Sequence, residues 1–125
     1  MQNCAARVVM KKPKQEHVPS LLNELHWLPI KKRIAYKIAS LCHRSLNNSA
    51  PIYLQNFLHQ YEPSRRLRSS NSLLLAEPRY KQERYGRRSF TLQGPLTWNS
   101  LPLELRSLAS YLAFKGKLKT YLFNV

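Results

Sequence analysis

The residues best suited to chemistry form a basic run between positions 65 and 88. The run holds eight lysine and arginine side chains against only two acids, Glu77 and Glu83. A guanidinium group engages phosphate oxygens in two-point contacts, and a tyrosine ring stacks on unpaired bases. We therefore interpret as a nucleic-acid-binding surface the residues Arg65, Arg66, Arg68, Arg79, Tyr80, Lys81, Arg84, Tyr85, Arg87 and Arg88. The alternative is a solvated loop whose tyrosines belong to the core.

No set of residues for catalysis or metal binding can be assembled from this sequence. The chain has no aspartate and its six acids are dispersed glutamates, so neither a two-metal carboxylate site nor a Ser/His/Asp triad is present. Cys4 and Cys42 stand apart without a Cys-x-x-Cys pair, which favours two free thiols over zinc ligands. We interpret His26 as a structural histidine that donates to a backbone carbonyl. We expect no catalytic residue, no metal and no cofactor.

The overall charge indicates a polyanionic partner. Twenty-one Lys and Arg residues against six acids give a formal net charge of +15. Such an excess attracts nucleic acid, because phosphate contacts supply most of the sequence-independent affinity. No apolar stretch approaches the roughly 18 residues needed to span a bilayer. The expected partners are RNA, DNA or both, with no membrane, in an intracellular ribonucleoprotein of the nucleus or cytoplasm.

Two motifs that contain the chain's two tryptophans are expected to hold the scaffold together. They are LHWLP at residues 25–29 and GPLTWNSLP at residues 94–102. A buried indole contributes a large apolar area, and the proline that follows restricts the backbone and suits the first turn of a helix. We predict structural roles for Trp27, Pro29, Trp98 and Pro102. Asn99 and Ser100 are expected to cap the short helix that begins at Pro102.

The apolar periodicity predicts a mainly α fold, a single small helical domain over residues 1–125 with a short β-hairpin or strand pair in the middle. Residues 1–61 form the helical half, with helices over residues 2–10 and 19–25, between Pro29 and Asn47, and after Pro51. The stripe of the third helix is Ile30, Ile34, Ile38, Leu41, Cys42 and Leu46. The helix after Pro51 is expected to turn inward Tyr53, Leu54, Phe57, Leu58 and Tyr61.

Residues 62–94 are expected to hold the basic loop and the β element. The leucines at 73–75 are typical of a short buried strand ended by Pro78, and residues 89–92 alternate between polar and apolar as a strand does. Residues 95–125 return to helix, with Ser110 as the N-cap of the last one. The apolar stripe of that helix is Tyr111, Phe114, Leu118, Tyr121 and Leu122.

Several motifs, taken in order along the chain, resemble one known protein segment. They are QNCAAR, LHWLP, RIAYKI, APIYL, LRSS, GRRSF, GPLTWNSLP and FKGKLKTYLF, which begin at residues 2, 25, 33, 50, 67, 86, 94 and 114. Over nearly its whole length the chain resembles the carboxyl-terminal end of the reverse transcriptase of LINE-type (non-LTR) retrotransposons of the jockey-like group. That region follows the polymerase domain, and the aspartates of the family's polymerase site have no counterpart here.

The resemblance implies an accessory segment that holds template RNA or target DNA beside the polymerase and catalyses no reaction by itself. Two alternatives stay open. One is a structural docking module that packs on the upstream reverse-transcriptase domain or on another protein. The other is a truncated element remnant without a selected function, because Met1 falls inside the family pattern.

Overall fold

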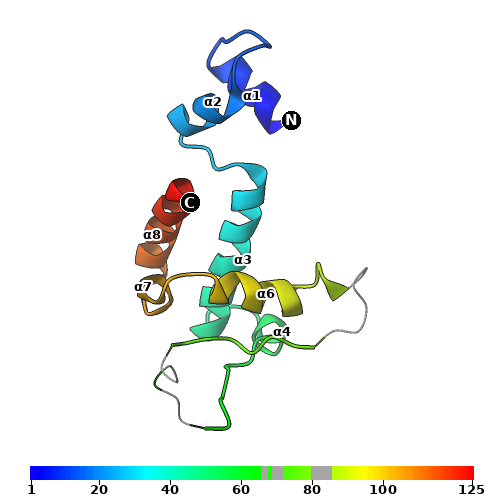
Figure 1. Ribbon diagram of the computed structural model, residues 1–125, viewed down its shortest axis with the longest axis vertical. Helices are drawn as coiled ribbons and strands as arrows, with labels where there is room; N and C mark the ends of the chain where they lie inside the picture. The colour runs from blue at the N-terminus through cyan, green and yellow to red at the C-terminus, as the bar shows by residue number, and fades with distance from the viewer. Residues whose placement is uncertain (66–67, 69–71, 80–85) are drawn as a thin grey trace.

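The computed structural model describes residues 1–65, 68, 72–79 and 86–125. In these ranges the regular structure is helical (Figure 1), and the mainly α prediction is confirmed. The helices are α1 (Gln2–Val9), α2 (Val18–Glu24), α3 (Ile30–Leu46), α4 (Ile52–Gln55), α6 (Phe90–Asn99), α7 (Leu103–Arg106) and α8 (Tyr111–Asn124).

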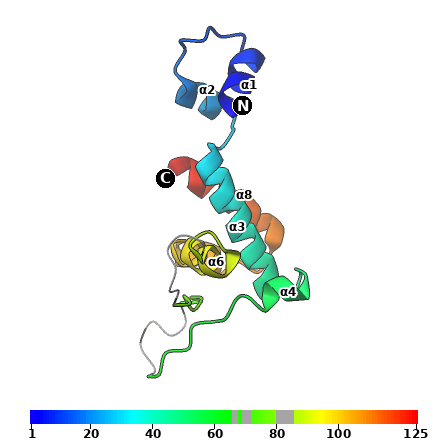
Figure 2. The same cartoon turned by 90° about the vertical axis from the view of Figure 1, so that its right-hand side faces the viewer.

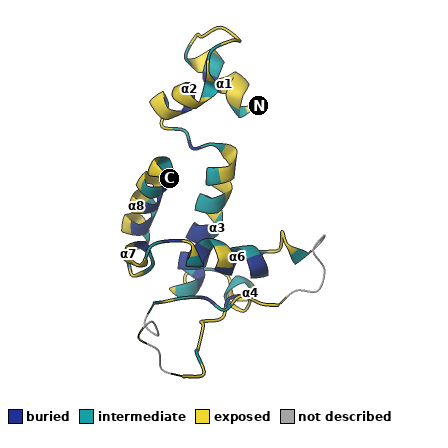
Figure 3. Ribbon diagram, in the orientation of Figure 1, coloured by how far each residue is buried: buried dark blue, intermediate teal, exposed yellow. Residues whose placement is uncertain are grey.

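Three helices, α3, α6 and α8, enclose the main core. Figure 1 shows α6 crossing the lower part of α3, while α8 runs beside α3. Trp98, Phe114 and Leu118 are almost wholly buried at the centre, and Figure 3 shows the buried parts of the chain gathered where these helices meet. Each such side chain stabilises the fold by about 1.5–3 kcal/mol through the apolar area it removes from water. This core is the scaffold on which every candidate site rests.

The buried face of α3 differs from the stripe expected from the sequence. Ile30 and Ile34 are 57% and 56% exposed, whereas Ala39 and Cys42 are buried. The small side chains let α6 approach closely, since a Cβ atom added at Gly94 of α6 would lie 3.3 Å from the Cys42 sulfur. Close helix packing thus selected the face with small residues, and the predicted stripe is wrong in the first half of this helix.

A small helical hairpin made of α1 and α2 lies at the amino-terminal end of α3, away from the main core (Figures 1 and 2). Its own apolar cluster contains Ala6, Leu21 and Leu22. The chain leaves the hairpin through His26, whose φ of 52° lies in the left-handed region. Gln2 Nε2 then donates to Leu28 O at 2.8 Å, which ties α1 to the start of α3.

The segment after Pro51 forms a much shorter helix than the sequence predicted. Leu58 is buried as expected, but three aromatic side chains expected to face inward are 46–61% exposed: Tyr53, Phe57 and Tyr61. The backbone N–H of Tyr61 donates to Leu74 O at 2.9 Å, so the chain has left helical geometry by this point to pair with the middle segment. The inward-facing prediction is therefore wrong for these aromatic residues.

The expected β-hairpin is not seen in the part of the chain that the structure describes. Residues 90–92, expected in a strand, form the first turn of α6. Four alternating residues are too few to distinguish a strand from one helical turn, and the burial of Leu92, Pro95 and Trp98 at three-residue spacing favours the helix. In the middle segment a single antiparallel bridge joins Gln60 to Leu75.

Asn99, at the end of α6, holds the middle segment against the core. Its Oδ1 accepts from Leu75 N and its Nδ2 donates to Leu75 O, both at 2.9 Å. The amide side chain thus bonds this backbone as a neighbouring strand would. It does not cap α7, whose N-cap is Pro102, and Ser100 Oγ donates to a carbonyl of its own helix. The capping prediction is wrong for both residues. The Asn99 side chain, expected at a helix N-terminus, bonds the backbone of the middle segment instead.

The last helix, α8, follows the predicted pattern. Ser110 Oγ accepts from Ala113 N at 3.5 Å, which confirms the predicted N-cap. Phe114, Leu118 and Leu122 are buried along one face, as their spacing predicted. The helix therefore presents its apolar stripe to α3 and its lysines to solvent.

Candidate nucleic-acid interface

The arginines of the basic run are exposed wherever the structure describes them. The exposed members are Arg65, Arg68, Arg79, Arg87 and Arg88. The predicted members that lie outside the described residues are Arg66, Tyr80, Lys81, Arg84 and Tyr85. An exposed guanidinium presents its planar set of donors to an external phosphate, so the described arginines have the accessibility that phosphate binding needs.

The described arginines fall on separate parts of the surface. Residues 62–65 lie at the bottom of both views, away from the helices, whereas residues 86–89 lead directly into the first turn of α6 (Figures 1 and 2). The two stretches are not side by side in either view. The structure therefore does not bring the two ends of the basic run together in one described patch.

Two side chains from α6 and α7 fix the chain between these stretches. Trp98 Nε1 donates to Leu73 O at 2.9 Å, and Arg106 donates to Ser72 O. Burial lowers the pKa of Arg106 from its ordinary value, because desolvation disfavours the charged form. Both bonds are made to main-chain carbonyls, so they hold this backbone whatever side chains it carries. The exposed arginines of the run are thus attached to a segment that the core anchors.

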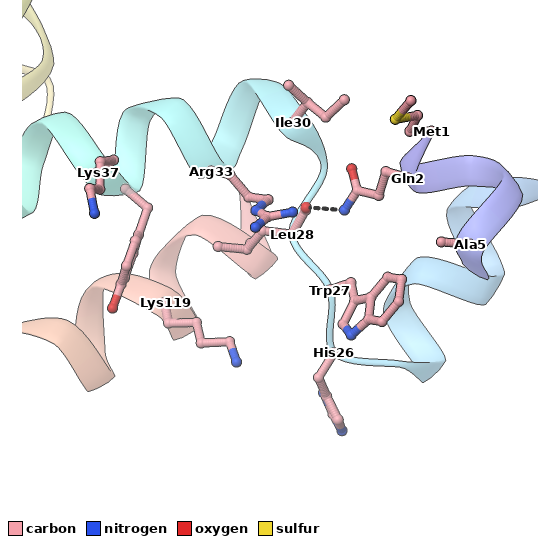
Figure 4. Close-up of a pocket in the computed structure, with 11 residues that line it drawn as sticks. Met1, Gln2, Ala5, His26, Trp27, Leu28, Ile30, Arg33, Lys37 and Lys119 are labelled. Atoms are coloured by element: carbon pink, nitrogen blue, oxygen red, sulfur yellow. Dashed lines mark hydrogen bonds between the residues drawn. The ribbon is translucent and has the colours of Figure 1, made fainter. Parts of the chain in front are cut away.

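A second cationic surface lies where the α1–α2 hairpin, α3 and α8 meet. It is a groove of about 860 Å³, and we call it the corner groove. Figure 4 shows Arg33 and Lys37 on α3, Lys119 on α8, and Trp27 on the segment that joins α2 to α3. None of the described side chains that line the groove is acidic. Three cations from two helices therefore surround one concave space with no carboxylate among them, which is an electrostatic setting for an anion.

The walls of the corner groove are held in place by contacts around Phe123 of α8. The rings of His26 and Phe123 meet edge to face with their centroids 6.2 Å apart. Lys119 Nζ lies 5.9 Å from the centre of the same Phe123 ring, a cation–π distance. Together with the bond from Gln2 to Leu28, these contacts attach the hairpin to both α3 and α8.

The histidine that bonds a backbone carbonyl in the core is His43, not His26. His43 is 1% exposed, and its Nε2 donates to Leu108 O at 2.7 Å. Its ring stacks on Phe114 at a centroid distance of 4.3 Å and an interplanar angle of 19°. His26 is exposed and its ring contacts Phe123 edge to face, so the carbonyl bond predicted for it is not seen among the described residues.

The two cysteines lie in opposite environments. Cys4 is exposed on α1, whereas Cys42 is buried on α3. Burial raises the pKa of the Cys42 thiol to about 12, because desolvation disfavours the thiolate. The Cys42 side chain thus behaves as a small apolar group at neutral pH.

The corner groove was not predicted from the sequence, although part of its lining is recognisable there. Arg33 and Lys37 are four residues apart, which places them on one side of a helix. Trp27 and Lys119 come from distant parts of the sequence, and they line the same space only in the folded chain. A basic pair at helical spacing was the one local clue.

The described ranges contain no group of three His, Cys, Asp or Glu side chains placed to hold a metal ion. In those same ranges, no helix combines the length and apolarity required to cross a membrane. Comparisons with protein-family models, curated proteins and solved structures find no match to this chain.

Proposed function

We propose that this chain is a non-catalytic nucleic-acid-binding module, an accessory segment of a LINE-type reverse transcriptase that holds template RNA or target DNA within a ribonucleoprotein. The observation that carries the proposal is the charge. If each of the six acids paired with one base, fifteen of the 21 Lys and Arg side chains would still have no acidic partner in the chain. Mutual repulsion of so many cations disfavours the compact state, and a polyanion relieves it. The order of the resembling motifs supports the same assignment.

The exposed arginines are the groups that carry out this function in the proposal. Because Arg65, Arg68, Arg87 and Arg88 are all exposed, a phosphodiester chain can reach them without unfolding any helix. Contacts to phosphate position a nucleic acid without reading its sequence. The module is therefore expected to bind many sequences, and to hold a strand while the polymerase acts elsewhere.

A salt titration tests the proposal. The purified chain is titrated against a 20-nucleotide single-stranded RNA, a 20-base-pair DNA duplex and heparin, with fluorescence anisotropy as the measurement. Neutralising about six phosphates gives a slope of log affinity against log salt of roughly −4 on the single strand and roughly −5 on the duplex. An affinity that hardly changes between low and moderate salt contradicts the proposal. Equal affinity for heparin at every salt concentration reduces it to plain polyanion attraction.

A matched pair of charge reversals locates the binding residues. The test variant is Arg65→Glu, Arg66→Glu and Arg68→Glu. The control is Lys11→Glu, Lys12→Glu and Lys14→Glu, in the exposed connector between α1 and α2. Each variant changes the net charge by six, from +15 to +9, so a general charge effect is the same in both. Loss of three phosphate contacts lowers single-strand affinity about 100-fold at 0.1 M salt. An equal loss in the two variants argues against the arginine cluster.

A hydrophobic docking role is the second candidate, and the apolar side chains around α4 favour it. Ile52 is 75% exposed, and Tyr53 and Phe57 are 61% and 46% exposed. Exposed apolar groups that lie close together mark protein contact surfaces. Under this function, Ile52→Ser with Phe57→Ser abolishes association with the upstream polymerase domain in titration calorimetry and leaves nucleic-acid affinity unchanged. The arginine reversals give the opposite result.

A further inference from the structure

We infer that the corner groove is a binding site for an unpaired nucleotide of a single-stranded nucleic acid, with phosphate on Arg33, Lys37 and Lys119 and the base against Trp27. This inference rests on the proposed nucleic-acid binding. It adds a place on the fold and a preference for single strands that the basic run alone does not supply.

The size of the groove suits this ligand. Its volume of about 860 Å³ falls in the range of roughly 300–1,000 Å³ that small-molecule sites occupy. Its walls come from three directions: the α1–α2 hairpin, α3 and α8 (Figure 4). A splayed nucleotide fits between such walls, whereas a stiff duplex needs an open face. The shape therefore selects single strands.

The cations are placed for a backbone that passes between two helices. Arg33 and Lys37 are one turn apart on α3, about 5–6 Å at their Cβ atoms. Lys119 belongs to α8 on the other side of the groove. All three side chains are exposed, so their charged groups reach a ligand without breaking the core. A phosphate in the groove thus meets positive charge from both helices and no carboxylate from the wall.

The aromatic wall supplies the contact for the base. Trp27 packs against the apolar cluster of the hairpin and also lines the groove, so its indole is held by the protein and half-exposed to the ligand. Tyr36 of α3 lines the same space and is also half-buried. An aromatic ring fixed in this way is a stacking platform that accepts any base.

A pair of double variants tests the phosphate contacts. The groove variant is Lys37→Gln with Lys119→Gln. The control is Lys31→Gln with Lys117→Gln, which removes one exposed lysine from each of the same two helices outside the groove. Loss of two phosphate contacts lowers affinity for a 20-nucleotide single-stranded RNA about 25-fold at 0.1 M salt and makes the salt slope shallower by about 1.4. The control lowers the affinity for the same RNA only about twofold. Affinity for a blunt DNA duplex is the same in both variants.

Tryptophan fluorescence tests the base contact. Trp98 is only 2% exposed, so quenching by a bound oligonucleotide reports on Trp27. We expect the single-stranded RNA to quench the emission of the full chain and the duplex to leave it unchanged. Trp27→Ala loses the quenching and lowers single-strand affinity about tenfold or more, because the stacking contact with the base is removed. Far-ultraviolet circular dichroism checks that each variant is folded.

The outcomes separate this inference from the proposed function. If the groove and control variants lose single-strand affinity equally while the unmodified chain still binds with a steep salt dependence, the groove is not a site and the proposed function stands. If binding quenches no tryptophan emission, the placement of the base on Trp27 is wrong. If the unmodified chain binds neither nucleic acid, both the proposed function and the groove site are refuted.

Discussion

Replacing Asn99 with alanine should loosen the middle segment from the core. The Asn99 amide makes two bonds of 2.9 Å with the backbone of Leu75, one to its N–H and one to its C=O. Leu75 itself is only 2% exposed, so water does not readily replace the lost partner. The same segment leads back to the exposed arginines of the basic run. The substitution therefore tests whether one side chain attaches this part of the chain to α6.

The expected loss follows from the two bonds. A net contribution of about 1 kcal/mol for each gives a destabilisation of about 2 kcal/mol, and it rises toward about 3 kcal/mol if the groups of Leu75 stay unsatisfied. Small domains have total stabilities of about 5–15 kcal/mol, so the variant should still fold. The midpoint of thermal unfolding should fall by roughly 8 °C.

Urea unfolding followed by circular dichroism at 222 nm measures the change. Ser100→Ala is the matched control, because that exposed hydroxyl bonds only a carbonyl of its own helix, and the control should lose less than about 0.5 kcal/mol. Equal small losses in both variants would refute the structural role of Asn99.

Asn99→Asp sharpens the test through its pH dependence. The new carboxylate would face the Leu75 carbonyl and Glu77 Oε1, which Asn99 Nδ2 contacts at 3.0 Å. Like charge raises the pKa of the introduced group in the folded state. Stability should therefore be highest at acidic pH, where the protonated acid can donate, and should fall as the pH rises above about 4.

The two helical glycines, Gly94 and Gly116, and the two cysteines, Cys4 and Cys42, each have one buried and one exposed member, which gives two further predictions. Gly94→Ala should destabilise the fold by about 1 kcal/mol, because its Cβ would lie 3.1 Å from Leu58 Cδ2 and 3.3 Å from Cys42 Sγ. Gly116→Ala meets nothing within 4 Å and should stabilise α8 by about 0.5–1 kcal/mol in the same urea assay; the opposite order would contradict the packing of α6 on α3. For the cysteines, iodoacetamide at pH 8 should label Cys4 and leave Cys42 unlabelled until urea is added, since a pKa of about 12 leaves roughly one thiolate in ten thousand. The unfolded thiol ionises near pH 9 and the folded one near 12, so this group should lower stability as pH rises through that window.

Local sequence signals predicted the helices well where a cap or a proline fixed the boundary. Pro29 is the N-cap of α3 and Ser110 that of α8, and both helices lie where the sequence placed them. The same signals failed where a pattern of only four or five residues fits both a strand and a helical turn, or does not show where a helix ends. Residues 89–92 alternate like a strand yet lead into a helix, and the helix after Pro51 stops after one turn. The secondary structure of such a short segment is selected by the segment it packs against, which lies far away in the sequence.

Of the two candidate sites, one was visible in the sequence and the other only in the fold. Sequence alone indicated the basic run, because arginines close together along the chain are visible without a fold. The fold decided that the two ends of the run, residues 62–65 and 86–89, lie apart, and it assembled the corner groove from Trp27, Arg33 and Lys119. No periodicity links those three positions. Trp27 and Lys119 line one groove because the segment after α2 contacts α8, where the rings of His26 and Phe123 meet.

The sequence by itself determined the positive charge, the mainly helical content and the boundaries of α1, α2, α3 and α8, because these depend on residue type and on neighbours within one or two turns. The tertiary structure decided which face of α3 is buried, which histidine enters the core and which strand-like segment Asn99 holds. These choices depend on how closely α6 and α8 approach α3. That distance is set by the small side chains at Ala39, Cys42 and Gly94, whose contribution appears only when the helices pack.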